Sequence, residues 1–146
     1  MMSVPLVGGL LRVLSEETRD HILRTVWAKG YEDITRAHLA VFQFPAPERA
    51  TPSELANRAH ISKQSMNYLL SELEQRRYLG RRDVATDGRS RVVFLTPRGK
   101  QLVRTMRQSV EELEEGWAEM VGRESFDQMK SALMRIYSST RQDESR

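Results

Sequence analysis

The stretch TPSELANRAHISKQSMNYLLSELEQRR, residues 51–77, decides the fold because it carries two helix starts close together. Thr51 and Glu54 form a capping-box pattern with proline in the first turn, which predicts a helix over 52–59. Ser62 supplies a second N-cap. The apolar residues after it keep a helical spacing: Met66, Leu69, Leu70 and Leu73. Two short helices joined by a brief turn predict a helix-turn-helix.

The second of these helices carries polar residues on the side away from its apolar row. Glutamine and asparagine amides can pair bidentately with adenine, and lysine or serine can reach guanine or phosphate. We therefore expect this helix to enter the major groove of DNA. The alternative is that these residues are only the solvent-exposed face of an ordinary amphipathic helix. The candidate DNA-binding residues here are Ser62, Lys63, Gln64, Ser65, Asn67, Tyr68 and Ser71.

A two-stranded hairpin with a basic tip is predicted next. Arg91 to Leu95 is a strand candidate, Leu79 to Val84 is a weaker one, and Asp87-Gly88 between them supplies turn chemistry. Guanidinium groups near such a turn can grip phosphates or enter a minor groove, and a solvated loop is the alternative. Asp87 is expected to organise Arg89 or Arg91 rather than to bind a metal. The arginines near the turn are Arg81, Arg82, Arg89 and Arg91.

Helices are also predicted on both sides of this segment. An opening helix is expected to continue to about Lys29, where Gly30 ends it, and a second helix is expected over 32–42. Thr96-Pro97 repeats the cap-then-proline signal and predicts a long helix, which Gly116 or Gly122 bends or separates from a last one. The apolar rows of the outer helices run from Leu10 to Val26, from Leu102 to Met120 and from Phe126 to Tyr137.

The predicted fold class is therefore mainly α with a small β-hairpin wing. We expect a single domain over 1–146, with a winged-helix DNA-binding lobe at 32–100 and dimerisation helices at 1–29 and 101–139. The apolar rows exceed what a compact winged helix needs, which indicates a homodimer, with an intramolecular helical core as the alternative. A two-fold dimer would present two recognition helices to a palindromic site.

The charge distribution favours a polyanionic partner. Counting Lys and Arg against Asp and Glu, the net charge is −1 over 1–56, +8 over 57–107 and −4 over 108–146. The chain has no cysteine, which excludes disulfides and thiolate zinc sites. The apolar run at 4–14 is too short to cross a bilayer, so we expect a cytoplasmic protein without membrane contact.

An enzyme is not expected. The three histidines, His21, His38 and His60, have no metal-ligand spacing, and the sequence has neither a Gly-rich phosphate loop nor a nucleophile with a base partner. No metal and no cofactor is therefore predicted.

The run from 83 to 91, DVATDGRSR, and the run from 95 to 100, LTPRGK, resemble the MarR family of winged-helix transcriptional regulators. The resemblance implies a homodimer joined by its first and last helices, with the recognition helix in the major groove and the wing in the minor groove. Asp87, Arg89 and Arg91 match the wing, with Gly88 in its turn, and Ser62 to Ser71 match the recognition helix. Arg77 stands where the family often has glycine. It suggests a differently built turn and an extra phosphate contact.

The resemblance also implies a small-molecule effector that binds between the dimer helices and the DNA-binding lobe. Trp27, Tyr31, His38 and Phe42 lie where such a pocket could form, but aromatic residues at this spacing favour plain core, so no ligand is assigned to them. The predicted function is a sequence-specific DNA-binding repressor relieved by an effector. The alternative is a winged helix used for protein contacts without DNA affinity.

Overall fold

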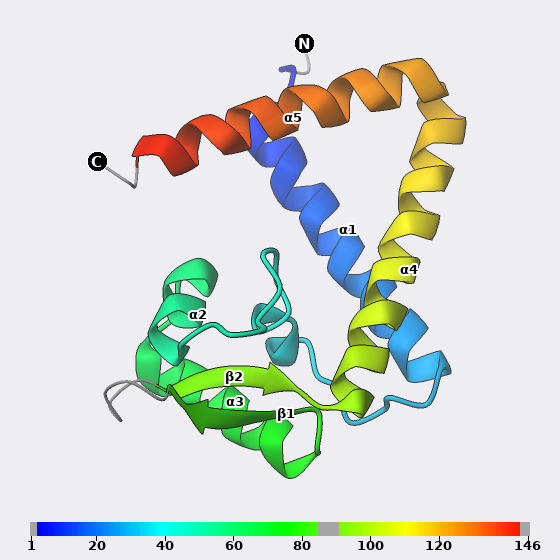
Figure 1. Cartoon of the computed structure of the whole chain (residues 1–146). Coiled ribbons are helices and arrows are strands. Elements are labelled where there is room, and N and C mark those ends of the chain that lie inside the picture. The colour runs from blue at the N-terminus through cyan, green and yellow to red at the C-terminus, as the bar shows by residue number, and fades with distance from the viewer. Residues whose placement is uncertain (1–2, 85–90, 144–146) are drawn as a thin grey trace. The chain divides into compact units, whose positions relative to one another are not determined.

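The computed structural model describes residues 3–84 and 91–143. It confirms the predicted class, mainly α with one antiparallel hairpin (Figure 1). Two compact units divide the chain, one extending to Ser109 and the other beginning at Val110, and helix α4 runs through both. In chain order the elements are α1 (Val7–Ala28), η1 (Ala37–Ala40), α2 (Pro52–Ala59), α3 (Lys63–Gln75), β1 (Leu79–Asp83), β2 (Arg91–Leu95), α4 (Pro97–Val121) and α5 (Arg123–Asp143).

Helices α2 and α3 form the predicted helix-turn-helix. Thr51 accepts a hydrogen bond from the Glu54 N–H, and the Glu54 carboxylate accepts one from the Thr51 N–H, each at 3.2 Å. The Ser62 hydroxyl accepts from the Ser65 N–H at 3.0 Å and caps α3. The expected apolar row of α3 is buried in the core of the first unit, which confirms the predicted orientation of the helix: Met66, Leu69, Leu70 and Leu73.

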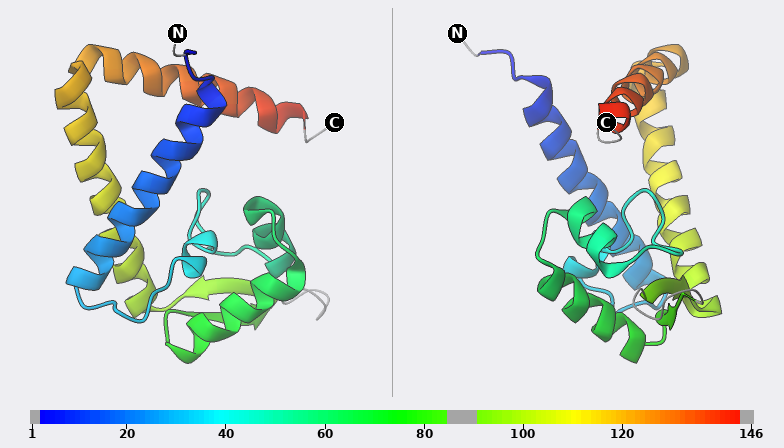
Figure 2. Two further views of the ribbon diagram at one scale, coloured as in Figure 1. Left: turned by 180° about the vertical axis from the view of Figure 1, so that it is seen from behind. Right: turned by 60° about the vertical axis from the view of Figure 1, so that its left-hand side comes forward.

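The hairpin follows α3 directly and packs beside it (Figure 2). Its register pairs Leu79 with Leu95 and Asp83 with Arg91. The chain before α2 is hydrogen-bonded to β2, because the Val93 N–H donates to the Ala50 carbonyl and the Arg49 N–H donates to the Val93 carbonyl, each at 2.8 Å. The predicted strands are thereby confirmed, and the helix-turn-helix and hairpin share one core.

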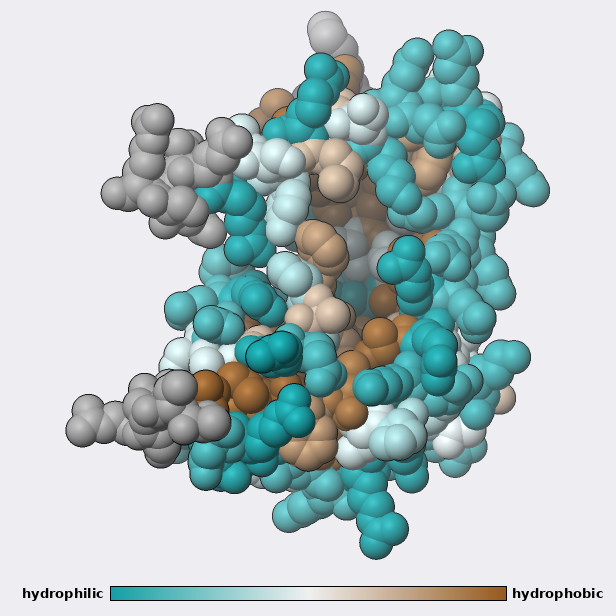
Figure 3. All heavy atoms as spheres, viewed as in Figure 1, coloured by the Kyte–Doolittle hydropathy of each residue, from teal (hydrophilic) through white to brown (hydrophobic). Residues whose placement is uncertain are grey.

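The outer face of the hairpin is mixed in polarity. Figure 3 shows hydrophobic side chains over the hairpin with hydrophilic ones around them. Phe94 lies opposite Gly80 in the register, and an added Cβ at Gly80 would come within 2.4 Å of the Phe94 ring. The Arg82 guanidinium lies 5.3 Å from the centre of the same ring. Glycine at this position therefore leaves room for the aromatic ring under an exposed cation.

The helix expected over 32–42 is not formed, and only the short η1 lies in this segment. Two carbonyls that a helix would need are bonded to side chains from elsewhere. Trp27 Nε1 donates to the Ile34 carbonyl at 2.7 Å, and the Arg76 guanidinium donates to the Asp33 carbonyl. The expectation of a longer helix was wrong because these tertiary hydrogen bonds replace the helical ones.

The turn after α3 has the geometry that glycine usually provides, although Arg77 occupies it. Arg77 has φ of +65°, and the two hydrogen bonds of a Schellman motif are present. The Tyr78 N–H donates to the Leu73 carbonyl at 2.9 Å and the Arg77 N–H donates to the Glu74 carbonyl at 3.0 Å. The different turn expected from Arg77 is therefore not found.

The outer helices divide their apolar residues between core and surface. In α1, Leu23 and Val26 are buried, whereas the residues nearer its start are exposed, Leu10 and Leu11 among them. In the second unit, Gly122 has φ of +92° and separates α4 from α5, whereas Gly116 lies inside α4. Lys130 of α5 pairs with Glu114 of α4 at 3.0 Å.

Candidate functional site

Helix α3 exposes a polar crest on the side away from the core. Gln64, Tyr68 and Gln75 lie along this crest, spaced by four and seven residues, and Tyr68 is 66% exposed. Ser71 is also exposed near it. Within the described residues no hydrogen bond holds the side chain of Gln64, Tyr68 or Gln75, so the crest is available to a partner. Of the predicted recognition residues, Ser62, Lys63 and Ser65 are exposed as well.

One flank of α3 is fixed by Arg81 of β1. Its Nη1 donates to the Asn67 side-chain oxygen at 2.9 Å, its Nη2 donates to the Ser71 hydroxyl at 3.2 Å, and its Nε donates to the Glu74 carboxylate. The Arg81 side chain is only 16% exposed. The Arg81 side chain was predicted to contact phosphate. In the structure its N–H donors bond within the protein and hold the hairpin against α3.

The opposite flank of α3 is held by a network that reaches the segment before α2. The Glu72 carboxylate contacts Arg76 Nη2 and His38 Nε2, each at 3.3 Å. His38 is fully buried, and its Nδ1 accepts from the Thr35 N–H at 2.9 Å. Burial lowers the pKa of His38, and the hydrogen bond to Glu72 opposes part of that effect. With Arg81 on the other side, α3 is fixed on both flanks.

A groove of about 430 Å³ lies where α2, α3 and the hairpin meet. Lys63, Arg81 and Arg91 bring cationic side chains to it, and the start of α2 contributes the Ser53 N–H and the positive end of the helix dipole. Arg91 also pairs with Asp83 at 3.4 Å and remains 57% exposed. This combination suits an anion such as phosphate. The lining residues are Thr51, Pro52, Ser53, Lys63, Asn67, Arg81 and Arg91.

Three predicted site residues, Asp87, Gly88 and Arg89, lie outside the described residues. Arg77 is exposed at the C-terminal turn of α3. Sequence reasoning missed Gln75 and Ser53. Gln75 continues the spacing of Gln64 and Tyr68 and could have been found from it, whereas the place of Ser53 in the groove depends on how α2 meets α3.

The residues considered for an effector contribute mainly to the core. His38 is buried, Tyr31 and Phe42 pack against the core cluster, and Trp27 is partly exposed while donating to Ile34. The interpretation that favoured plain core is consistent with these positions. No ligand is assigned to them.

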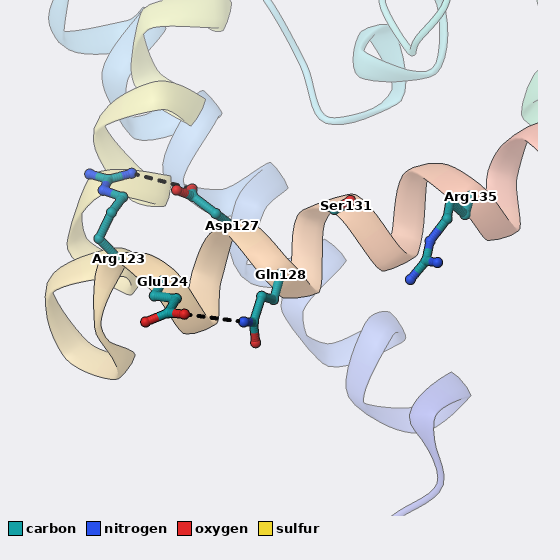
Figure 4. A pocket seen from close by; sticks show the side chains of 6 residues that line it. All are labelled: Arg123, Glu124, Asp127, Gln128, Ser131 and Arg135. Carbon is teal, nitrogen blue, oxygen red and sulfur yellow. Dashed lines mark hydrogen bonds and ion pairs between the residues drawn. The ribbon is translucent and has the colours of Figure 1, made fainter.

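A second hollow, of about 800 Å³, lies on α5 in the other unit (Figure 4). Several of its polar side chains pair with one another along the helix. Arg123 contacts Asp127 at 4.0 Å, and the Gln128 amide donates to Glu124 at 3.5 Å. Because these groups already have partners on their own helix, we assign no ligand to this hollow.

Over residues 3–84 and 91–143, no three acidic or histidine side chains come together in a way that could hold a metal ion. None of the helices described there has the length and apolar character needed to span a membrane.

Comparisons with known proteins give a match to a family model over part of the chain and solved structures with a similar fold. Residues 32–90 match the sequence model of the MarR family. A MarR transcriptional regulator from Methanosarcina mazei Go1 is similar in structure, with 18% identity and a TM-score of 0.74 over 93% of this chain and 96% of that chain. MepR of S. aureus in complex with DNA has 22% identity and a TM-score of 0.65 over 93% and 99%. A transcriptional regulator from Thermotoga maritima has 21% identity and a TM-score of 0.60 over 95% and 96%. A search of curated proteins gave no match.

Proposed function

We propose that this chain, whose winged-helix segment belongs to the MarR family, is a transcriptional regulator that binds a specific sequence of double-stranded DNA. The resemblance expected from the wing and exit motifs is confirmed by the family match. One observation carries the proposal. The exposed crest of α3 lies beside a groove lined by Lys63, Arg81 and Arg91, so a base-reading surface and a phosphate-binding surface are adjacent.

This surface offers two kinds of contact to DNA, one to phosphates and one to bases. Phosphate contacts fix the position of a protein on the duplex, and base contacts in the major groove supply sequence preference. Lys63, Arg91 and the start of α2 are suited to phosphate, and the side chains of the α3 crest are suited to base edges. The likeness to MepR, which was crystallised with DNA, supports this division.

We further propose a homodimer on a palindromic operator. Leu6, directly before α1, is exposed, as are Val7, Leu10 and Leu11 at the start of the helix, and α5 exposes Met134 and Ile136. Apolar side chains at this density on the surface of a small protein favour burial against another subunit. A second copy of the chain would bury them and present two α3 helices to successive turns of the duplex.

The regulatory sense of the proposal is repression relieved by a small-molecule effector. It is supported by the resemblance to MarR regulators stated above. The segment that contains His38 is linked to α3 through Glu72 and Arg76, so a molecule that displaced this segment would also move the recognition helix.

Selection from a pool of random duplexes by the full-length protein tests the proposal. We expect enrichment of a palindrome whose half-sites lie about one helical turn apart. Recovery of no duplex, with no measurable affinity at low salt, would contradict DNA binding and favour a winged helix that contacts proteins.

A further inference from the structure

Helix α3 has a different environment on each of its sides. Its apolar side is buried, and one flank carries Glu72 and Arg76, which bond to the segment before α2. The other flank faces Arg81. The crest between the two flanks is exposed. Among the described residues its side chains Gln64, Tyr68 and Gln75 make no hydrogen bond within the protein, whereas Ser71, between Tyr68 and Gln75, accepts one from Arg81.

Asn67 belongs to the Arg81 flank rather than to the crest. A guanidinium group can only donate hydrogen bonds, so the atom that faces Arg81 at 2.9 Å must be the amide oxygen of Asn67. A bidentate contact with adenine needs that oxygen and the amide nitrogen together at the base edge. Because Asn67 is half-buried and its oxygen points to Arg81, the amide is turned away from the face that would meet bases.

The position of each crest residue along α3 indicates which of them would contact bases. In helix-turn-helix proteins, residues in the N-terminal part of the recognition helix meet base edges. Gln64 and Tyr68 lie in the first half of α3, and Gln75 is its last residue. The Gln64 amide suits adenine, and the Tyr68 ring offers apolar contact to a thymine methyl group.

We propose that Gln64 and Tyr68 are the residues that read bases, whereas Asn67 acts with Arg81 as a positioning residue that fixes the rotation of α3. This inference rests on the proposed DNA-binding function and deepens it. In this proposal the sequence preference of the protein comes from Gln64 and Tyr68. Asn67, which the sequence analysis grouped with them, does not contribute to it.

The test repeats the random-duplex selection with full-length variants. Gln64→Ala should lose preference at one base pair in each half-site, by roughly tenfold. Asn67→Asp keeps an acceptor for Arg81, removes the amide donor and adds a negative charge beside the groove. Repulsion of phosphate should weaken its binding to all duplexes, and it should keep the wild-type consensus. Gln108→Ala is the matched control, because it removes the same side chain from an exposed position of α4 outside the crest, and it should also keep that consensus.

Uracil in place of thymine gives a second readout, because it removes only the methyl group. The wild type should lose affinity at the position that Tyr68 contacts, and Tyr68→Ala should be insensitive to the replacement there. Circular dichroism and unfolding curves of each variant show whether it is folded before binding is compared.

The outcomes separate this inference from the function on which it rests. A changed consensus in Asn67→Asp, together with an unchanged consensus in Gln64→Ala and Tyr68→Ala, would overturn the assignment while leaving DNA binding intact. A wild-type protein that enriches no duplex would overturn the proposed function, and this inference with it.

Discussion

Replacing Gly99 with alanine should destabilise the fold strongly, because this residue packs against the backbone of the turn after α3. An alanine Cβ would lie 1.8 Å from the carbonyl oxygen of Tyr78 and 2.9 Å from its carbonyl carbon. The same oxygen accepts hydrogen bonds from the Thr96 N–H at 3.1 Å and from the Thr96 hydroxyl at 2.9 Å. The clash therefore falls on backbone, which cannot rotate away as a side chain would.

The expected loss in the free energy of unfolding follows from the contacts that break when Gly99 and the Tyr78 backbone are forced apart. Forcing a methyl group into a packed site costs about 1–3 kcal/mol, and each of the two hydrogen bonds to Tyr78 contributes about 1 kcal/mol. The expected loss for Gly99→Ala is therefore about 3–5 kcal/mol, a large share of the roughly 5–15 kcal/mol that stabilises an ordinary domain.

Urea unfolding at one fixed protein concentration measures this loss. Gly116→Ala is the matched control, because Gly116 is exposed inside α4 and an added Cβ there would meet nothing within 4 Å. That change should stabilise the protein by up to about 1 kcal/mol through helix propensity. If Gly99→Ala unfolded at the urea concentration of the wild type, the close packing of Tyr78 against the start of α4 would be refuted.

Four other substitutions have expected outcomes. Arg77→Gly should raise the free energy of unfolding by about 0.5–1 kcal/mol, because φ of +65° strains arginine and not glycine; an unchanged urea midpoint would count against this. Arg91→Ala should make the negative slope of log affinity against log salt shallower by about 0.9 for each phosphate that the variant no longer neutralises. Arg81→Gln should weaken binding and leave that slope unchanged, since the Arg81 donors bond within the protein. His38 has its pKa lowered in the fold, so the unfolded chain takes up the proton more readily and stability should fall as pH drops below 6.5. His38→Gln should show a shallower fall in unfolding curves measured above and below that pH, and an equally steep fall would contradict the buried neutral imidazole.

Local signals in the sequence were sufficient for the helix-turn-helix. The capping box at Thr51 and the cap at Ser62 act within one helical turn, and the apolar row of α3 depends on its own spacing. The hairpin was also predictable, because its strand pattern is local. These elements formed as expected because no distant group competes for their backbone hydrogen bonds.

The features that sequence reasoning missed depend on residues far apart in the chain. The carbonyl of Asp33 bonds to Arg76, 43 residues later, and this bond helps prevent a helix over 32–42. A base contact was predicted for Asn67 because its side chain is polar and lies on α3, and it stays a prediction; the neighbour that holds the side chain could not be predicted. Its bond to Arg81 arises only when the hairpin folds back beside the helix.

The central claim is that the crest of α3 and the adjoining cationic groove bind duplex DNA together. Fluorescence anisotropy of a labelled selected duplex, titrated with the full-length protein over a series of salt concentrations, tests it most directly. We expect log affinity to fall linearly with log salt, by about 0.9 for every phosphate neutralised, and the selected duplex to bind more tightly than a scrambled one at each concentration. Equal binding of both duplexes, or affinity that does not respond to salt, would contradict the account.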